Sequence, residues 1–217
     1  MEKRLGCKVL QGYGMTELSP VSHVIPHDLP DIDLNSVGVA IPNVECKLVD
    51  PETGQEVGVG ERGELWVKGP NVMREYLNNP TATASTLDAD GFLHTGDVAV
   101  INEAGVYTIV DRVKELIKYK GYQVPPAELE ALLLTNDKIA DAAVIGVIDD
   151  EGEEVPKAFV VRQAAADLTG DEVMAFVAER IAPHKKVRVV EFIDEIPKSA
   201  SGKILRKDLR AREAAKA

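Results

Sequence analysis

Short stretches of alternating apolar and polar residues dominate the first half of the chain. Residues 44–50, VECKLVD, alternate as a half-buried β-strand does, and residues 63–69 repeat the pattern after a polar turn. Residues 97–110 hold two apolar runs around NEAG and predict a hairpin. We also expect a short strand at 8–11 that leads into a glycine-rich turn, a loop-rich segment over 21–43, and a short helix over 79–87. Strands therefore prevail in this half, and we expect a small barrel or sandwich.

The second half changes to helix-period patterns between buried strands. Leu129, Leu132 and Leu133 recur at helical spacing after two prolines, and Thr169 is placed to cap a second amphipathic helix. We expect helices over 125–136, 169–181 and about 204–215, and strands over 140–149, 156–163 and 186–194. This is an α+β pattern. The composition changes across residues 111–124, which are the best candidate for a domain boundary.

Composition and charge narrow the classes of function. The chain has 217 residues, of which 45% are apolar, so a hydrophobic core can form. Its formal net charge of −11 argues against a nucleic-acid-binding protein or one that binds anionic membranes. Cys7 and Cys46 fit neither a disulfide framework nor a zinc-site spacing, which indicates a reducing, cytoplasmic setting. No apolar run approaches the roughly 18 residues of a membrane span.

Three patterns resemble functional motifs but favour plainer interpretations. Residues 58–63, GVGERG, match GxGxxG, yet they precede a strand instead of following one, so a hairpin turn is the better interpretation. His23 and His27 have the spacing of a helical metal pair, but Pro26 between them disfavours a helix. The acidic run 149–154 lacks calcium-loop spacing and is interpreted as a solvated turn.

The residues QGYGMTE at 11–17 offer groups that suit a nucleotide. Gly12 and Gly14 allow close backbone approach, and Tyr13 offers a flat ring. Thr16 offers a hydroxyl to a phosphate oxygen, and Glu17 offers a hard oxygen ligand for Mg²⁺. Taken alone, such a segment is usually an ordinary turn.

Three further sites carry candidate chemistry. Asp97 is expected at the start of an apolar strand, where its carboxylate can accept hydrogen bonds from two ribose hydroxyls or simply close a turn. Residues 111–128 form a local basic segment in an acidic chain, although a solvated, charged strand pair is an equal alternative. Lys203 follows Gly202 as a P-loop lysine would, but Pro197 stands where the P-loop requires its first glycine.

Five motifs together carry a resemblance that none carries alone. They occur in this order: QGYGMTE, GELWVKGPNVMREYLNNP, DGFLHTGD, DRVKELIKYKGYQVPPAELE and PKSASGKILRKDL. Over essentially the whole chain, the sequence resembles the C-terminal part of adenylate-forming enzymes, and it is most similar to 4-coumarate–CoA ligases and luciferase-like ligases. The resemblance implies an α+β fold: a β-rich tail of the large adenylating domain, with a barrel-like subdomain, followed by a small mobile α+β domain.

The resemblance implies a two-step reaction and a role for each candidate residue. A carboxylate attacks the α-phosphate of ATP to give an acyl-adenylate, and the thiol of CoA then displaces AMP. Lys203 would be the catalytic lysine of the first step, because a movable cation stabilises charge on the reacting oxygens. The remaining roles would be Glu17 for Mg²⁺; Gln11, Gly12, Tyr13, Thr16, Asp97, Arg112, Lys114, Lys118 and Gln123 for ATP, AMP or the adenylate; and Lys120 and Gly121 for CoA.

The resemblance also implies a domain organisation and partners. Residues 1–112 would be the incomplete end of the large AMP-binding domain, and 113–217 would swing about a hinge at 111–114. Residues 19–24 would edge the acyl pocket. Relatives of this type carry an upstream phosphate loop, so we expect a fragment that is inactive alone, has exposed apolar surface in its first half, and pairs with an N-terminal portion. The alternatives are a non-catalytic module that binds CoA, a carrier protein or such a portion, and a luciferase-like oxygenase.

Overall fold

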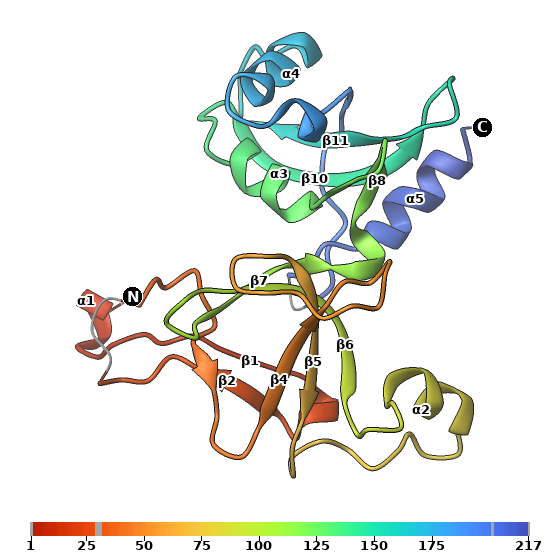
Figure 1. Cartoon of the computed structure of the whole chain (residues 1–217). Coiled ribbons are helices and arrows are strands. Elements are labelled where there is room, and N and C mark those ends of the chain that lie inside the picture. The colour runs from red at the N-terminus through yellow and green to blue at the C-terminus, as the bar shows by residue number, and fades with distance from the viewer. Residues whose placement is uncertain (1, 29–31, 201, 217) are drawn as a thin grey trace. The chain divides into compact units, whose positions relative to one another are not determined.

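The computed structural model describes residues 2–28, 32–200 and 202–216, and divides the chain into two compact units, residues 1–113 and 114–217 (Figure 1). No helix within these described ranges is long and apolar enough to cross a membrane. Large apolar side chains are exposed in the first unit, for example Leu77 at 87% and Leu5 at 61%, but also in the second, where Ile148 is 69% exposed. Such exposure therefore does not distinguish the two units.

The first unit is built on two antiparallel sheets. One contains β1 (Gly12–Gly14), β2 (Val21–Val24) and β3 (Val39–Ala40), and the other contains β4 (Glu45–Val49), β5 (Gly63–Lys68), β6 (Leu93–Ile101) and β7 (Tyr107–Arg112). Three short helices accompany them: α1 (Glu2–Leu5), the 3-10 helix η1 (Thr16–Leu18) and α2 (Pro80–Thr86). Alternate residues of β5 are buried, as the alternating sequence predicts, and Leu65 and Val67 join Leu18, Leu48 and Leu93 in one core.

The expected barrel is not closed within the described residues. Backbone hydrogen bonds link the two sheets where Tyr107 donates its N–H to the Gly38 carbonyl at 2.8 Å and its carbonyl accepts from the Val37 N–H at 2.8 Å. Two further expectations are wrong. Residues 8–11 form no strand, and the glycine-rich segment after them is itself strand β1, because it pairs with β2. Asp97 lies in the middle of β6, not at the start of a strand, because that strand already begins at Leu93.

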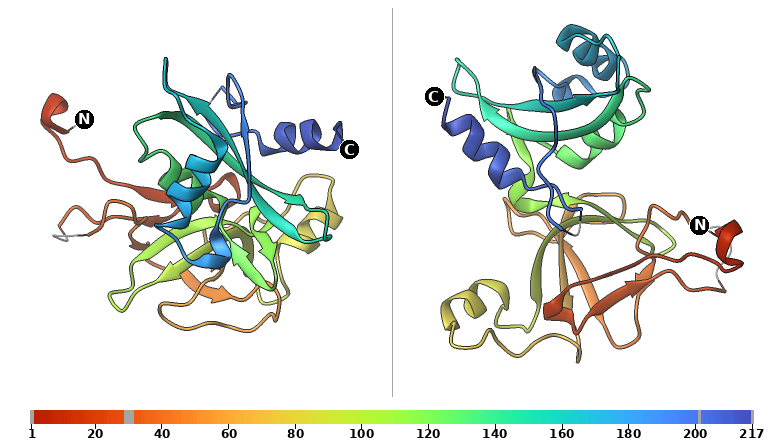
Figure 2. Two further views of the ribbon diagram at one scale, coloured as in Figure 1. Left: turned by 90° about the horizontal axis from the view of Figure 1, so that it is seen from above. Right: turned by 180° about the vertical axis from the view of Figure 1, so that it is seen from behind.

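The second unit has three layers, in which one sheet is covered by helices on both faces (Figure 2). Its elements are the 3-10 helix η2 (Val113–Glu115), β8 (Ile117–Tyr119), β9 (Tyr122–Val124), α3 (Pro126–Leu133), β10 (Ile139–Ile148), β11 (Glu154–Arg162), α4 (Gly170–Ala178), the 3-10 helix η3 (Pro183–Lys185), β12 (Val189–Phe192) and α5 (Arg206–Ala214). Alternate residues of β10 serve the two faces: Ala142 and Val144 pack under α3 and α4, whereas Ala143 and Ile145 pack with Leu209 of α5.

Local sequence signals explain where the helices begin. Asn79 accepts a hydrogen bond from the Ala82 N–H at 3.1 Å and caps α2 just before Pro80. Thr169 and Glu172 form a reciprocal capping box at the start of α4. These predicted helices are confirmed, with ends that differ by a few residues from the expected ones.

Candidate functional site

Three predicted residues from three separate segments meet in the first unit. The Tyr13 hydroxyl of β1 donates to the Asp97 carboxylate of β6 at 2.6 Å. Arg112, opposite Asp97 on β7, places its Nε 3.3 Å from the other carboxylate oxygen. The Asp97 side chain is 13% exposed and that of Arg112 is 57% exposed, so the cluster borders solvent. A carboxylate held this way keeps lone pairs that can accept from the hydroxyls of a ligand.

The surroundings of this cluster fix its protonation and orientation. Burial, and then the negative charge of Asp97, raise the pKa of Tyr13 well above its ordinary value, so its hydroxyl remains a donor. The Thr95 hydroxyl donates to the Leu65 carbonyl at 2.7 Å and accepts from the Asp97 N–H at 3.1 Å. The Thr95 hydroxyl therefore links the Asp97 backbone to β5 and helps to hold the Asp97 carboxylate in place.

Glu17 lies in η1, immediately after β1, and is held by the segment 71–76. Its carboxylate oxygen Oε1 accepts from the Tyr76 hydroxyl at 2.7 Å, and its carbonyl accepts from the Met73 N–H at 2.8 Å. The hydrogen bond to Glu17, together with burial, raises the pKa of Tyr76. Asn71 donates from its side-chain amide to the carbonyls of Leu18 at 2.9 Å and Val21 at 2.8 Å.

The donor set at Glu17 fits magnesium. The second carboxylate oxygen, Oε2, has no hydrogen-bond or ion-pair partner among the residues that the structure describes. Within that part of the chain, no group of three or more His, Cys, Asp or Glu side chains could hold a metal ion. A single hard carboxylate oxygen suits Mg²⁺, which is usually bound through one or two carboxylates together with phosphates and water.

The four other predicted residues of the first motif differ in their surroundings. A Cβ on Gly14 would lie 1.8 Å from the Pro20 carbonyl oxygen, and one on Gly12 would lie 3.0 Å from that of His23. Close packing within the chain itself therefore accounts for both glycines. Gln11 donates its side-chain amide to the Leu34 carbonyl, whereas Thr16 is exposed.

Four predicted residues of the second unit share the hairpin β8–β9. Lys118 pairs with Gln123 across the strands, and Lys120 and Gly121 form the two-residue turn. Both turn residues have positive φ, 48° and 81°, as a type I′ turn requires. For Gly121 this conformation explains the glycine, but a lysine at positive φ costs about 1 kcal/mol or more. Lys114 lies just before the hairpin, exposed in η2.

Aromatic side chains flank this turn and carry basic partners. The Arg188 guanidinium lies 3.7 Å from the ring centre of Tyr119, and the His184 ring stacks on Tyr122 at 4.4 Å. The turn is therefore a fixed basic feature of the surface.

Lys203 lies on a separate tight loop between β12 and α5. Its N–H donates to the Ser199 hydroxyl at 3.2 Å, and its carbonyl accepts from the Ser199 N–H at 2.9 Å. The Lys203 side chain is exposed and forms no ion pair with any described residue. Ser201 of this loop lies outside the described residues.

The base of the Lys203 loop is anchored by residues that the sequence analysis missed. Arg206, at the start of α5, forms two hydrogen bonds to Glu130 of α3, at 2.8 and 2.7 Å. Glu130 is only 7% exposed and also accepts from the Val144 N–H at 2.8 Å. Neither Glu130 nor Tyr76 carries a local signal of this role, because each contact joins residues far apart in the chain.

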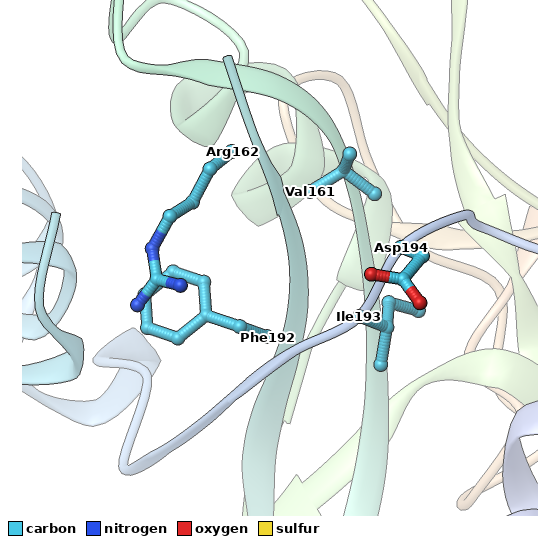
Figure 3. Close-up of a pocket in the computed structure, with 5 residues that line it drawn as sticks. All are labelled: Val161, Arg162, Phe192, Ile193 and Asp194. Carbon is cyan, nitrogen blue, oxygen red and sulfur yellow. The ribbon is translucent and has the colours of Figure 1, made fainter. Parts of the chain in front are cut away.

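The cavity in Figure 3 lies elsewhere and contains none of the predicted site residues. It measures about 340 Å³ and is lined by Val161, Arg162, Phe192, Ile193 and Asp194. The Arg162 guanidinium lies 3.4 Å from the centre of the Phe192 ring, and its Nε donates to the Leu168 carbonyl at 2.9 Å. Arg162 thus has a structural role at the end of β11.

Family models match both units of the chain. Residues 1–77 match the model of AMP-binding enzymes, and residues 128–203 match the model of the AMP-binding enzyme C-terminal domain.

Curated plant proteins are similar over almost the whole chain. A rice protein, 4-coumarate–CoA ligase-like 4, is 51% identical over 208 residues, which cover 96% of this chain and 38% of the relative. Peroxisomal OPC-8:0-CoA ligase 1 of Arabidopsis thaliana is 50% identical, with the same two coverages. The chain therefore spans about 38% of the length of these relatives.

Solved structures support the same fold. ATP-bound MatB from Rhodopseudomonas palustris superposes with a TM-score of 0.89 at 34% identity, over 97% of this chain and 42% of that one. O-succinylbenzoate CoA synthetase (MenE) of Bacillus subtilis, in complex with ATP and a magnesium ion, gives a TM-score of 0.82 at 32% identity, over 96% of this chain and 42% of that one.

Proposed function

The chain belongs to the AMP-binding enzymes and corresponds to the C-terminal part of their 4-coumarate–CoA ligase-like members; on that premise, we propose that it serves an ATP-dependent carboxylate–CoA ligase. The observation that carries the proposal is the contact of Tyr13, Asp97 and Arg112. It presents a fixed carboxylate beside a guanidinium at the edge of solvent, which is an arrangement that can bind the two hydroxyls of a ribose.

In the first step, these residues would orient the nucleotide while the acid reacts. Asp97 and Arg112 would hold the ribose, and Tyr13 would fix the Asp97 carboxylate by donating to it. The substrate carboxylate then attacks the α-phosphorus, pyrophosphate leaves, and an acyl-adenylate forms. Lys203 would stabilise the charge that develops on the transferring oxygens, because its ammonium lies on an exposed loop and has no ion-pair partner among the described residues. Magnesium, when bound with ATP, would neutralise phosphate charge, and Glu17 would be its protein ligand.

In the second step, the CoA thiol attacks the acyl carbon, a thioester forms, and AMP leaves. The hairpin turn of Lys120 and Gly121 would contact the CoA arm, while Lys114, Lys118 and Gln123 would face the adenylate. Lys203 and the β8–β9 hairpin belong to the same unit but lie on different segments of it. We infer that this unit turns about residues 111–114 between the steps, so that each element serves one reaction.

The acid is an aryl or a fatty acyl carboxylate in this proposal. The two plant relatives are equally similar to the chain, yet one is named for 4-coumarate and the other for an OPC-8:0 acid. Both classes of acid therefore belong in the test. We also propose a cytoplasmic location, although one of these relatives is named as peroxisomal.

The test uses a hybrid enzyme, defined as this chain joined behind the portion of the rice relative that precedes the matched region. With ATP, Mg²⁺ and a panel of aryl and fatty acids, we expect acid-dependent pyrophosphate release and, after CoA is added, a thioester. Lys203→Ala should lower pyrophosphate release at least about a hundredfold, by removal of a charge-stabilising group. Lys207→Ala, which removes an exposed lysine four positions away, is the matched control.

Two outcomes would reject the proposal. If no acid in the panel releases pyrophosphate, or if Lys203→Ala has no more effect than Lys207→Ala, the adenylating role is wrong. CoA binding by the 217-residue chain together with such a failure would favour a non-catalytic CoA-binding module instead.

A further inference from the structure

The segment 71–76 donates four hydrogen bonds to residues 17–21, the segment that carries Glu17. Two come from the Asn71 amide to the carbonyls of Leu18 and Val21, and one comes from the Met73 N–H to the Glu17 carbonyl. The fourth is the only one of the four that reaches the Glu17 side chain, from the Tyr76 hydroxyl to Oε1 at 2.7 Å. The backbone of the turn is therefore held by hydrogen bonds that do not involve Tyr76, whereas the Tyr76 hydroxyl bonds to the Glu17 carboxylate.

Tyr76 is itself held in place by the helix that follows it. Its N–H donates to the Thr83 hydroxyl at 3.0 Å, and that hydroxyl donates to the Asn79 carbonyl at 3.0 Å. Asn79 in turn caps α2 with its side chain. The phenol therefore approaches Glu17 from a helix-anchored position, so its hydroxyl can restrain the carboxylate.

The two oxygens of Glu17 are consequently not equivalent. Oε1 is occupied by the Tyr76 hydroxyl, whereas Oε2 has no partner in the described ranges. A hydrogen bond at one oxygen orients the carboxylate and draws electron density from that oxygen, so the other oxygen is the better-placed ligand for a cation. Mg²⁺ accepts such single-oxygen ligands in a strict octahedron, whereas Ca²⁺ has six to eight ligands and readily takes both oxygens of a carboxylate.

We propose that Tyr76 is a positioning residue that makes Glu17 a one-oxygen ligand and thereby favours Mg²⁺ over Ca²⁺ in the nucleotide site. The inference rests on the proposed function, in which Glu17 binds the metal. Loss of the Tyr76 hydroxyl frees Oε1, so the carboxylate can rotate and can chelate a larger ion with both oxygens. The affinity for Mg²⁺ then falls, and the affinity for Ca²⁺ is kept or rises.

The experiment measures ATP binding to the hybrid enzyme by calorimetry, over a series of Mg²⁺ and separately of Ca²⁺ concentrations. No turnover is needed, because acid and CoA are left out. For Tyr76→Phe, we expect the half-saturating Mg²⁺ concentration to rise about tenfold, as for other residues that orient metal ligands, and that of Ca²⁺ to change less than about threefold. The ratio of the two constants separates metal selectivity from a general loss of nucleotide affinity.

Tyr13→Phe is the matched control. It also removes a tyrosine hydroxyl from a carboxylate in the same unit, but from Asp97. It should weaken ATP binding equally at all concentrations of either metal. A merely structural effect of Tyr76→Phe would resemble this control and would leave the ratio of Mg²⁺ to Ca²⁺ constants unchanged, which would overturn the inference.

Two Glu17 variants separate this inference from the proposed function. If Glu17→Gln leaves the Mg²⁺ dependence unchanged, Glu17 is not the metal ligand, and both the inference and the metal-binding role of Glu17 in the proposed function fail. If Glu17→Gln changes it and Tyr76→Phe does not, only the inference fails. Glu17→Asp keeps the charge but withdraws the carboxylate from Tyr76, so it tests the same contact even where Tyr76→Phe does not fold. It should also lower the ratio of Mg²⁺ to Ca²⁺ affinity, and an unchanged ratio would contradict the inference.

Discussion

His23 should make the stability of the first unit sensitive to mild acid. The imidazole is fully buried on β2. Its Nδ1 lies 2.9 Å from the Ser22 hydroxyl, and its ring packs edge-on against Tyr107 at 4.5 Å between centres. No carboxylate pairs with it in the part of the chain that the structure describes. Burial alone therefore lowers the pKa of His23 from 6.5 to about 4.

The sign and size of the effect follow from proton linkage. A base with a lowered pKa in the folded state binds its proton more weakly there than in the unfolded chain. The stability that it contributes is thus complete above pH 6.5 and is lost as the pH falls toward 4. The difference between the two pKa values corresponds to about 3 kcal/mol of unfolding free energy, of which about 2 kcal/mol is already lost at pH 5. The neighbouring Cys46 and Tyr107, whose pKa values burial raises to about 12, stay neutral throughout this range.

Trp66 allows this loss to be measured in the first unit alone. It is the single tryptophan of the chain and lies on β5 of that unit. Urea unfolding followed by its fluorescence, at pH 7.5 and pH 5, gives the two free energies. The midpoint must be used and not the intensity, because the His94 ring stacks on Trp66 at 3.5 Å and this contact can itself change the fluorescence.

The variant His23→Gln removes the titrating group and keeps a polar side chain for Ser22. We expect it to lose about 2 kcal/mol less than the parent between pH 7.5 and pH 5. His27→Gln, which changes a side chain that is 83% exposed, should behave as the parent does. An equal loss in the parent and in His23→Gln would refute the reasoning, since it would show that His23 is not held neutral by burial.

Three further substitutions test the packing, each by urea unfolding. Gly14→Ala places a methyl group 1.8 Å from the Pro20 carbonyl oxygen, so the Trp66 transition should show a loss of about 3 kcal/mol. Lys157→Met removes an ammonium 2.8 Å from Glu191 and 2.6 Å from Glu213, which both keep Lys216 as a partner, and circular dichroism should show a loss of about 2 kcal/mol in the second unit. Thr169→Ala removes the cap of α4, and the free energy of unfolding measured by circular dichroism should fall by about 1 kcal/mol. Changes within about 0.5 kcal/mol would contradict each assignment.

The second unit was largely predictable because its signals are local. Helix α4 follows from an apolar stripe and a Thr169–Glu172 capping pair only three residues apart. Strands β10 and β11 follow from long apolar runs that flank an acidic turn. The first unit was less predictable, because the glycine-rich β1 is a strand only by virtue of its pairing with β2. Glycine has a low preference for strands, so no local sequence pattern predicts that β1 pairs with β2.

The candidate site shows the same division between local and distant signals. The neighbouring residues in sequence predict a binding role for Tyr13 and for Asp97 separately. Their contact joins residues 84 positions apart, and only the structure reveals it. Tyr76 was not singled out at all, because its partner Glu17 lies 59 positions away and its own surroundings resemble an ordinary helix approach. Residue types with chemistry can be read from a sequence, whereas the residues that orient them depend on packing between distant segments.

The region around Lys203 shows why that orientation matters for the proposed reaction. Ile196 before the loop and Leu209 after it are buried in one cluster, and Arg206 is tied to the buried Glu130. Both ends of the loop are therefore fixed to the sheet of the second unit. Between them, the Lys203 ammonium has no ion-pair partner among the described residues. A cation that is unpaired on a rigid base needs no internal contact to be broken before it meets a developing charge, which is the condition under which electrostatic stabilisation costs least in reorganisation.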